Sequence, residues 1–292
     1  MNQSEKNFPQ NFIFTHRYHL SSVTATRPMK IQISPQYQTL SDFIRSLTNP
    51  LFFEQQGEIL HEGRNTIKLF QWKDQRFVVK RYGHITLMNR LIYGTLRHSK
   101  ANRAYHHAIL LRQRGIDTPQ EVAFLEIRRH GLLHQSYFVS AYSEYLSLWS
   151  VTEHYLQDPE SQFIVHDLSA FLFKLHEAGV LHKDLNIGNI LYQHIRPHEY
   201  VFQVIDTNRM TFHRHLSIRQ RLDNLRRLSC PVPVYLDILD RYAHLISSNT
   251  TAIQLKGTMF RLFFEMRQQI KQGVKKVWKK KKNVDSSKNI QP

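Results

Sequence analysis

The chain has 292 residues, of which 41% are hydrophobic, so it can bury a sizeable core in one large domain or in two lobes that share a cleft. One cysteine excludes an internal disulfide, no apolar run approaches the roughly 20 residues that cross a bilayer, and the first residues lack the apolar segment of a signal peptide. The expected compartment is a reducing cytoplasm, and the formal net charge of +17 indicates an anionic partner such as nucleic acid, a phosphorylated small molecule or a membrane surface.

The first half of the sequence reads mainly as strands. Alternating apolar residues predict a β-meander between residues 57 and 82. A helix is predicted over 98 to 114, and two further strands are predicted over 121 to 127 and 136 to 142. Residues 1 to 28 are polar and aperiodic, which predicts a flexible leader.

The second half reads mainly as helices. Periodic apolar residues predict a helix over 161 to 178, and helical patterns predominate beyond residue 214. Between them lie a polar loop, "HKDLNIGN", and the predicted strand "YVFQVID", which ends in Asp206.

This loop and strand carry a candidate catalytic set. Asn189 and Asp206 offer two oxygen ligands of the kind that Mg²⁺ binds while it keeps waters and holds substrate phosphates. Asp184 then remains free to act as a base, although alone it could simply brace a turn. His182 and His176 are predicted to be structural, with His182 bridging the loop to the metal-binding strand.

Three motifs together resemble the protein-kinase-like superfamily. "HKDLNIGN" resembles its catalytic loop H-R-D-L-x-x-x-N, "VID" resembles the strand with its second metal-binding aspartate, and "FVVK" resembles its V-A-I-K strand. The resemblance implies an α+β, two-lobed protein-kinase-like fold, with a small β-rich N-lobe that has one helix and a larger, mainly helical C-lobe. The expected divisions are a leader over 1–28, an N-lobe over 29–145, a C-lobe over 146–256 and a basic tail over 257–292.

Longer strings give a narrower resemblance. "GEILHEGRNTIKLF", "SKANRAY", "RGIDTPQEVAFLE" and "LHKDLNIGNIL" are similar to the Kdo/WaaP-type lipopolysaccharide kinases. This resemblance implies transfer of the γ-phosphate of ATP to a sugar hydroxyl of a lipid-linked glycan, the lipopolysaccharide inner core (Kdo or heptose). It also implies a peripheral position at the inner face of the cytoplasmic membrane.

Phosphoryl transfer depends mainly on positioning and charge neutralisation, which assigns roles to these residues. Lys80 would pair with the α- and β-phosphates of ATP, Asn189 and Asp206 would hold Mg²⁺, and Asp184 would orient and deprotonate the attacking hydroxyl.

A turn at residues 63 to 65 is the second candidate for contact with the nucleotide. Gly63, Arg64 and Asn65 could bring backbone N–H groups close to its phosphates, although the turn lacks a full G-x-G-x-x-G.

Several positions depart from the protein-kinase pattern. The predicted helix over 98 to 114 has no carboxylate to pair with Lys80, which leaves Glu121, Glu126 or Asp206 as its partner. "TNRM" follows Asp206, no A-P-E segment follows it, and Asn186 stands where protein kinases commonly have a lysine. These departures favour a glycan or small-molecule acceptor, while a protein kinase and a catalytically inactive kinase-fold module at the membrane remain alternatives.

The C-terminal region predicts a basic amphipathic helix over 257 to 282. One face of this helix carries an apolar stripe, and basic residues occupy its other faces. The helix ends near the run "KKKK", and this composition suits an anionic membrane surface. The alternative is that its apolar stripe packs on the C-lobe. No zinc spacing or nucleic-acid-binding signature supports a nucleic-acid partner. The residues of the apolar stripe are Met259, Phe263, Met266, Ile270, Val274 and Val277.

Overall fold

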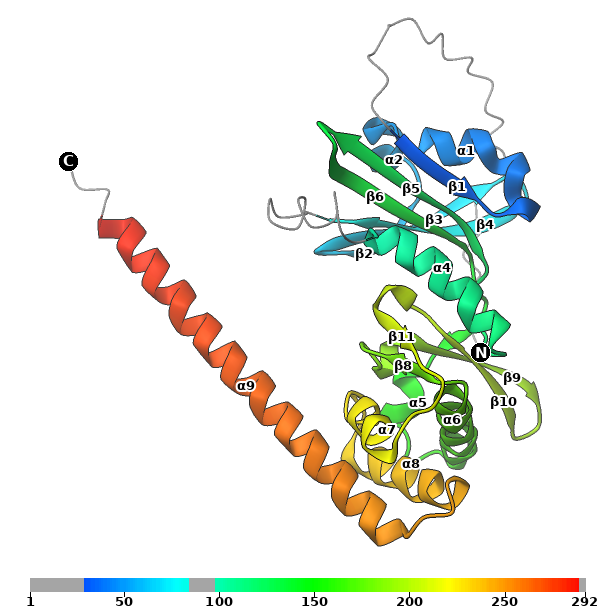
Figure 1. Ribbon diagram of the computed structural model, residues 1–292, viewed down its shortest axis with the longest axis vertical. Helices are drawn as coiled ribbons and strands as arrows, with labels where there is room; N and C mark the ends of the chain where they lie inside the picture. The colour runs from blue at the N-terminus through cyan, green and yellow to red at the C-terminus, as the bar shows by residue number, and fades with distance from the viewer. Residues whose placement is uncertain (1–28, 84–97, 289–292) are drawn as a thin grey trace, which may run out of the picture.

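The computed structural model describes residues 29–83 and 98–288, with side chains placed as far as residue 274. The predicted leader over 1–28 lies outside the described residues. A β-rich half is followed by a largely helical half, and one long helix runs away from the body of the molecule (Figure 1). The predicted two-part α+β architecture is confirmed.

A six-stranded antiparallel sheet builds the first half, with the strand order β1-β5-β6-β4-β3-β2. The predicted meander forms β2, β3 and β4, and the two later predicted strands form β5 and β6. The strands are β1 (Met29–Ile33), β2 (Glu58–Glu62), β3 (Asn65–Trp72), β4 (Gln75–Tyr82), β5 (Glu121–Arg129) and β6 (Leu132–Ala141).

Helices cover both faces of this sheet (Figure 1). The short elements η1 (Pro35–Leu40), α1 (Ser41–Ser46) and α2 (Pro50–Gln55) lie on one face, and α4 (Lys100–Gln113) lies on the other. Side chains alternate along β4, so Phe77 and Val79 enter the core beneath α1 and α2. Tyr82 belongs to the cluster with α4. Lys80 shares the face of Tyr82 and therefore points toward the α4 side.

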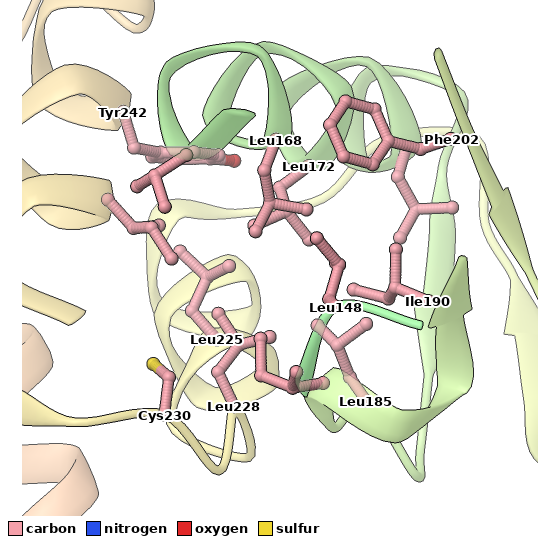
Figure 2. Packing of buried hydrophobic residues seen from close by; sticks show 14 of the residues in the cluster. Leu148, Leu168, Leu172, Leu185, Ile190, Phe202, Leu225, Leu228, Cys230 and Tyr242 are labelled. Carbon is pink, nitrogen blue, oxygen red and sulfur yellow. The ribbon is translucent and has the colours of Figure 1, made fainter. Parts of the chain in front are cut away.

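The helix α6 (Pro159–Glu177) is the central element of the second half. Asp158 caps its first turn by accepting from the backbone N–H groups of Glu160 and Ser161, both at 3.1 Å. Leu168 and Leu172 point from α6 into the main core (Figure 2). The other helices of this half are α5 (Trp149–Glu153), α7 (Ile218–Leu225) and α8 (Val232–Leu245).

Short strands and turns connect these helices and carry the candidate site. A three-stranded sheet has the order β10-β9-β7, and β8 pairs with β11. The sheet of the first half ends at Ala141 and the next strand begins at Leu146, and we propose residue 145 as the boundary between the lobes. The elements are β7 (Leu146–Ser147), β8 (Val180–His182), η2 (Ile187–Asn189), β9 (Ile190–Arg196), β10 (Glu199–Val204), η3 (Thr207–Arg209) and β11 (Met210–Phe212).

In the part of the chain that the structure describes, the long helix α9 (Thr250–Lys288) packs on α7 and α8 of the second half. Ile253 is buried, and a Cβ atom at Gly257 would lie 2.6 Å from the Leu239 side chain, so the absent side chain permits close contact with α8. The helix then projects from the molecule (Figure 1). Five residues of the predicted apolar stripe are exposed, namely Met259, Phe263, Met266, Ile270 and Val274.

The packing of α9 therefore uses a different face from the predicted stripe. Val277, the sixth residue of the stripe, lies beyond the described side chains. Among the helices that the structure describes, none is both long enough and apolar enough to cross a membrane.

Candidate functional site

A pocket of about 390 Å³ lies where the sheet, the start of α4 and the η3 segment meet. Four of the predicted site residues line it, whereas Lys80, Gly63 and Asn189 are not among the lining residues. The lining residues are Arg64, Asn65, Tyr82, Lys100, Arg103, Lys183, Asp184, Asp206, Asn208, Arg209, Met210 and Thr211.

Lys80 joins this pocket through an ion pair with Asp206. Its Nζ lies 2.8 Å from Asp206 Oδ1, and the two side chains are only 13% and 23% exposed. The other two candidate acids are engaged elsewhere, because Glu121 pairs with Arg112 and Glu126 with Arg128. Of the three acids that the sequence left open, the structure therefore brings Asp206 to Lys80.

The backbone conformation of Asp206 directs its carboxylate into the pocket. Asp206 ends the segment after β10 with φ 56° and ψ 48°, a left-handed conformation that residues other than glycine rarely adopt. Asn208 Nδ2 donates to Asp206 Oδ1, the oxygen that also receives Lys80. This turn leads the chain directly into η3, and the carboxylate lies between two donors, Lys80 and Asn208.

The loop that carries Asp184 is held by residues on both sides of it. His182 is fully buried, its Nε2 donates to the Ile205 carbonyl oxygen at 2.9 Å, and its Nδ1 accepts from the Asp184 N–H at 3.1 Å. Leu185 enters the main core immediately after Asp184 (Figure 2). The predicted structural role of His182 is confirmed, and the loop presents the Asp184 side chain to the pocket.

Asn189 stands behind this loop and ties it to the strand that precedes Asp206. Its Nδ2 donates to the Asp184 carbonyl oxygen at 2.8 Å, and its own carbonyl accepts from Ile205 N–H at 3.0 Å. Since the amide nitrogen is used in this way, the amide Oδ1 is the atom of Asn189 left for a cation.

Asp206 and Asn189 offer oxygens of the type that a magnesium ion completed by substrate phosphates takes. Such ions take one or two protein carboxylate or amide oxygens and keep several waters. Asp206 and Asn189 would be two such protein donors, and they lie on segments that are hydrogen-bonded to each other. Among the described residues, no three His, Cys, Asp or Glu side chains form a closed metal cage.

The predicted glycine turn lies at one end of the pocket. Arg64 and Asn65 line the pocket, and Asn65 Oδ1 accepts from Gly83 N–H at 3.3 Å. A Cβ atom at Gly83 would lie 1.7 Å from the Arg64 carbonyl oxygen, so only glycine allows the turn to close against the end of β4.

Cationic residues that the sequence reading missed complete the pocket. Lys100 and Arg103 come from the first turn of α4, while Lys183 and Arg209 flank the catalytic loop and η3. Burial lowers the pKa of Lys100, and the neighbouring positive charges of Arg64, Arg103 and Arg209 lower it further. Such crowding of like charges favours an anionic ligand. The sequence signal for Lys100 and Arg103 was their spacing, because residues three apart on a predicted helix lie on the same face.

The helix α4 is fastened to η3 beside the pocket. Thr207 Oγ1 donates to the Ala104 carbonyl oxygen at 2.9 Å, and His107 Nδ1 lies 2.7 Å from the Thr207 carbonyl oxygen. Arg114, just after α4, donates to the carbonyl oxygens of Ala178 and His213. The helix that contributes Lys100 and Arg103 is therefore fixed relative to Asp206.

A family model, the lipopolysaccharide kinase (Kdo/WaaP) family, matches residues 52–233, which include every predicted site residue. The chain belongs to this family. Membership supports a phosphotransferase and agrees with the Lys80, Asp184 and Asp206 arrangement.

A curated relative is consistent with this family assignment, and a solved structure shares the fold. A 3-deoxy-D-manno-octulosonic acid kinase from Vibrio cholerae serotype O1 is 28% identical over 151 residues, 49% of this chain. The aligned part spans 63% of the length of that curated relative. A solved structure titled "WaaP in complex with acyl carrier protein" has a TM-score of 0.54 at 16% identity and covers 82% of this chain and 97% of its own. At that identity the structural similarity shows the fold alone.

Proposed function

We propose that this lipopolysaccharide kinase family member transfers the γ-phosphate of ATP to a sugar hydroxyl of a lipid-linked glycan. The observation that carries the proposal is the pocket that holds Asp184, the Lys80–Asp206 ion pair and a surrounding group of cationic side chains. A base, an ion-pairing lysine and a carboxylate on separate elements are the parts that phosphoryl transfer needs.

In the proposed step, the acceptor hydroxyl oxygen bonds to the γ-phosphorus of ATP. The bond from that phosphorus to the oxygen that bridges to the β-phosphate breaks, ADP leaves with the electron pair, and Asp184 takes the hydroxyl proton. Lys80 and the turn at residues 63 to 65 hold the other phosphates. Asp206 and Asn189 would hold Mg²⁺, whose positive charge offsets charge that develops on the phosphate oxygens.

We propose the lipopolysaccharide inner core, at Kdo or heptose, as the acceptor. The name of the Vibrio cholerae relative supports Kdo, and the family description supports the wider class. The chain runs from the end of β11 at Phe212 to the start of α7 at Ile218, so little chain is available for the activation segment of a protein kinase. This short connection favours a glycan acceptor over a protein.

We also propose that the enzyme works as a peripheral protein on an anionic membrane surface, at the inner face of the cytoplasmic membrane. Its acceptor is lipid-linked, and the exposed apolar residues of α9 lie on a helix whose sequence continues into a run of lysines. Apolar side chains that enter the lipid interface and lysines that approach anionic headgroups would act together.

The experiment that tests this function offers the purified protein labelled ATP and Mg²⁺ with three separate acceptors. These are Kdo-containing glycolipid, heptose-containing glycolipid and a general protein acceptor. We expect label in one of the glycolipids, dependence on Mg²⁺, and no label in protein. Label in protein alone would support a protein kinase, and no transfer to any acceptor would favour an inactive kinase-fold module.

A further inference from the structure

The catalytic loop lacks a cation that protein kinases commonly place two residues after the base. Asn186 occupies that position, and its Nδ2 donates to the Asp184 carbonyl oxygen at 3.1 Å. The amide is therefore used to shape the loop and carries no charge. A transferring phosphoryl group still needs positive charge close to the base, because charge spreads over its oxygens in the transition state.

The structure supplies a cation at this place from a different segment. Arg209 Nη1 lies 3.2 Å from Asp184 Oδ2, and the two side chains are 56% and 41% exposed. The pair is open to the pocket, so the remaining guanidinium N–H groups of Arg209 can reach a ligand that is bound against Asp184.

The backbone on both sides of this ion pair is fixed. The Lys183 N–H donates to the Arg209 carbonyl oxygen at 3.0 Å, and Met210 pairs with His182 where β11 meets β8. Arg209 is therefore held next to the residue that precedes Asp184. Its position follows from strand pairing, and only its side chain is free to move between the base and a substrate.

The charge around Arg209 indicates what it would bind. Asp184 and Asp206 are the carboxylates that line the pocket, and Arg64, Lys100, Arg103 and Lys183 line it together with Arg209. The excess positive charge would be balanced by an anionic group that enters the pocket.

We propose that Arg209 is a catalytic residue that contacts the phosphoryl group during its transfer and takes the place of the missing lysine. The inference rests on the proposed function. As the acceptor oxygen bonds to the γ-phosphorus and ADP leaves, the guanidinium donates to the phosphoryl oxygens while Asp184 receives the hydroxyl proton. A bidentate guanidinium suits this role, because its planar N–H pairs match phosphoryl oxygens.

The test compares Arg209→Gln and Arg209→Lys with the parent protein. We expect a kcat about 10²–10³-fold lower in the glutamine variant, with a smaller loss in the lysine variant. The affinity for ATP and Mg²⁺, measured by titration, should change little. A double variant, Arg209→Gln with Asn186→Lys, should recover part of the lost kcat because the charge returns to the other side of the base.

A binding measurement separates this role from a structural one. ADP, Mg²⁺ and aluminium fluoride together imitate the transferring phosphoryl group, and they should raise the melting temperature of the parent protein more than ADP and Mg²⁺ alone. That extra shift should vanish in Arg209→Gln. Arg129→Gln, at an exposed position at the end of β5, removes the same charge away from the pocket and should retain the shift.

If Arg209→Gln keeps the parent kcat and the extra shift, Arg209 is only an ion-pair partner and the inference is wrong. A failure of the proposed function would look different, because the parent protein itself would then transfer no phosphate to glycolipid.

Discussion

At the scale of single residues, Asp206 has two functions at once. Its carboxylate pairs with Lys80, and its left-handed backbone turns the chain into η3. Asp184 is held differently, because its backbone is fixed by His182 and Asn189 while its side chain pairs with Arg209 and stays open to the pocket. Replacing either carboxylate therefore tests a different property of the site.

Replacing Asp184 tests the chemical step. We expect Asp184→Ala to lower turnover by orders of magnitude while ATP binding and the melting temperature stay close to those of the parent protein. The loop should keep its shape, because its contacts come from the Asp184 backbone and from Leu185. Turnover close to the parent value would remove Asp184 from the mechanism.

His176 gives the fold a pH dependence that is separate from catalysis. It is fully buried between Tyr242 and Asn224, and burial lowers its pKa to about 4, although the Asn224 hydrogen bond opposes part of the shift. These contacts confirm the predicted structural role. The folded protein therefore keeps this imidazole neutral at pH values where an unfolded chain would protonate it.

We expect this difference to destabilise the protein as the pH falls. Between the ordinary histidine pKa of 6.5 and about 4, unfolding takes up a proton, so the free energy of unfolding decreases by up to roughly 3 kcal/mol. Urea unfolding at a series of pH values should show a shallower decrease in His176→Gln than in the parent. His215→Gln provides the reference for loss of an exposed histidine. Equal slopes in the parent and in His176→Gln would assign the effect to other groups.

At the scale of elements, a buried lysine caps the C-terminal end of α2. Lys68 on β3 is 2% exposed, and its Nζ donates to the carbonyl oxygens of Phe53, Glu54 and Gln56 at 2.7, 2.8 and 3.0 Å. These carbonyls lie at the C-terminal end of α2, where intrahelical partners are missing. The cation therefore satisfies the helix end and joins α2 to the sheet that carries Lys80.

Removing this cap should destabilise the first half of the protein. We expect Lys68→Met to lower the free energy of unfolding by about 2–3 kcal/mol, because the methionine cannot donate to the buried carbonyl oxygens. Urea denaturation measures the loss, and Lys174→Met, at an exposed position on α6, is the matched control. Equal stability of the two variants would mean that water satisfies the end of α2.

At the scale of the whole molecule, long-range contacts account for what the sequence could not predict. The meander, α4, α6 and the loop of Asp184 follow from local periodicity and motifs. Strand β1 was missed because it pairs with β5, far along the chain, and α2 was missed because Lys68 completes its end. Arg209 was missed for the same reason, since strand pairing brings it beside Asp184.

The projecting α9 leads to a prediction about where the molecule works. We expect removal of residues 273–292, which include the lysine run, to weaken binding to anionic vesicles and slow phosphorylation of lipid-linked acceptor, with ATP affinity little changed. Each lysine near an anionic surface contributes roughly 1 kcal/mol. Vesicle sedimentation measures the effect, and added salt should weaken binding of the intact protein.

Vesicles of neutral lipid serve as the control for charge. If truncation changes neither binding to anionic vesicles nor turnover of the lipid-linked acceptor, the basic end of the chain is simply solvated.

The fastening of α4 to η3 has a consequence for how the activity is controlled. Protein kinases switch on and off partly by moving the corresponding helix. Here an outward movement of α4 would break the contacts of Thr207 and His107 and pull against Arg114, so the inactive arrangement would cost several hydrogen bonds. We therefore expect that the activity of the enzyme is not switched on and off by movement of α4. The flux through it would then follow the supply of acceptor at the membrane.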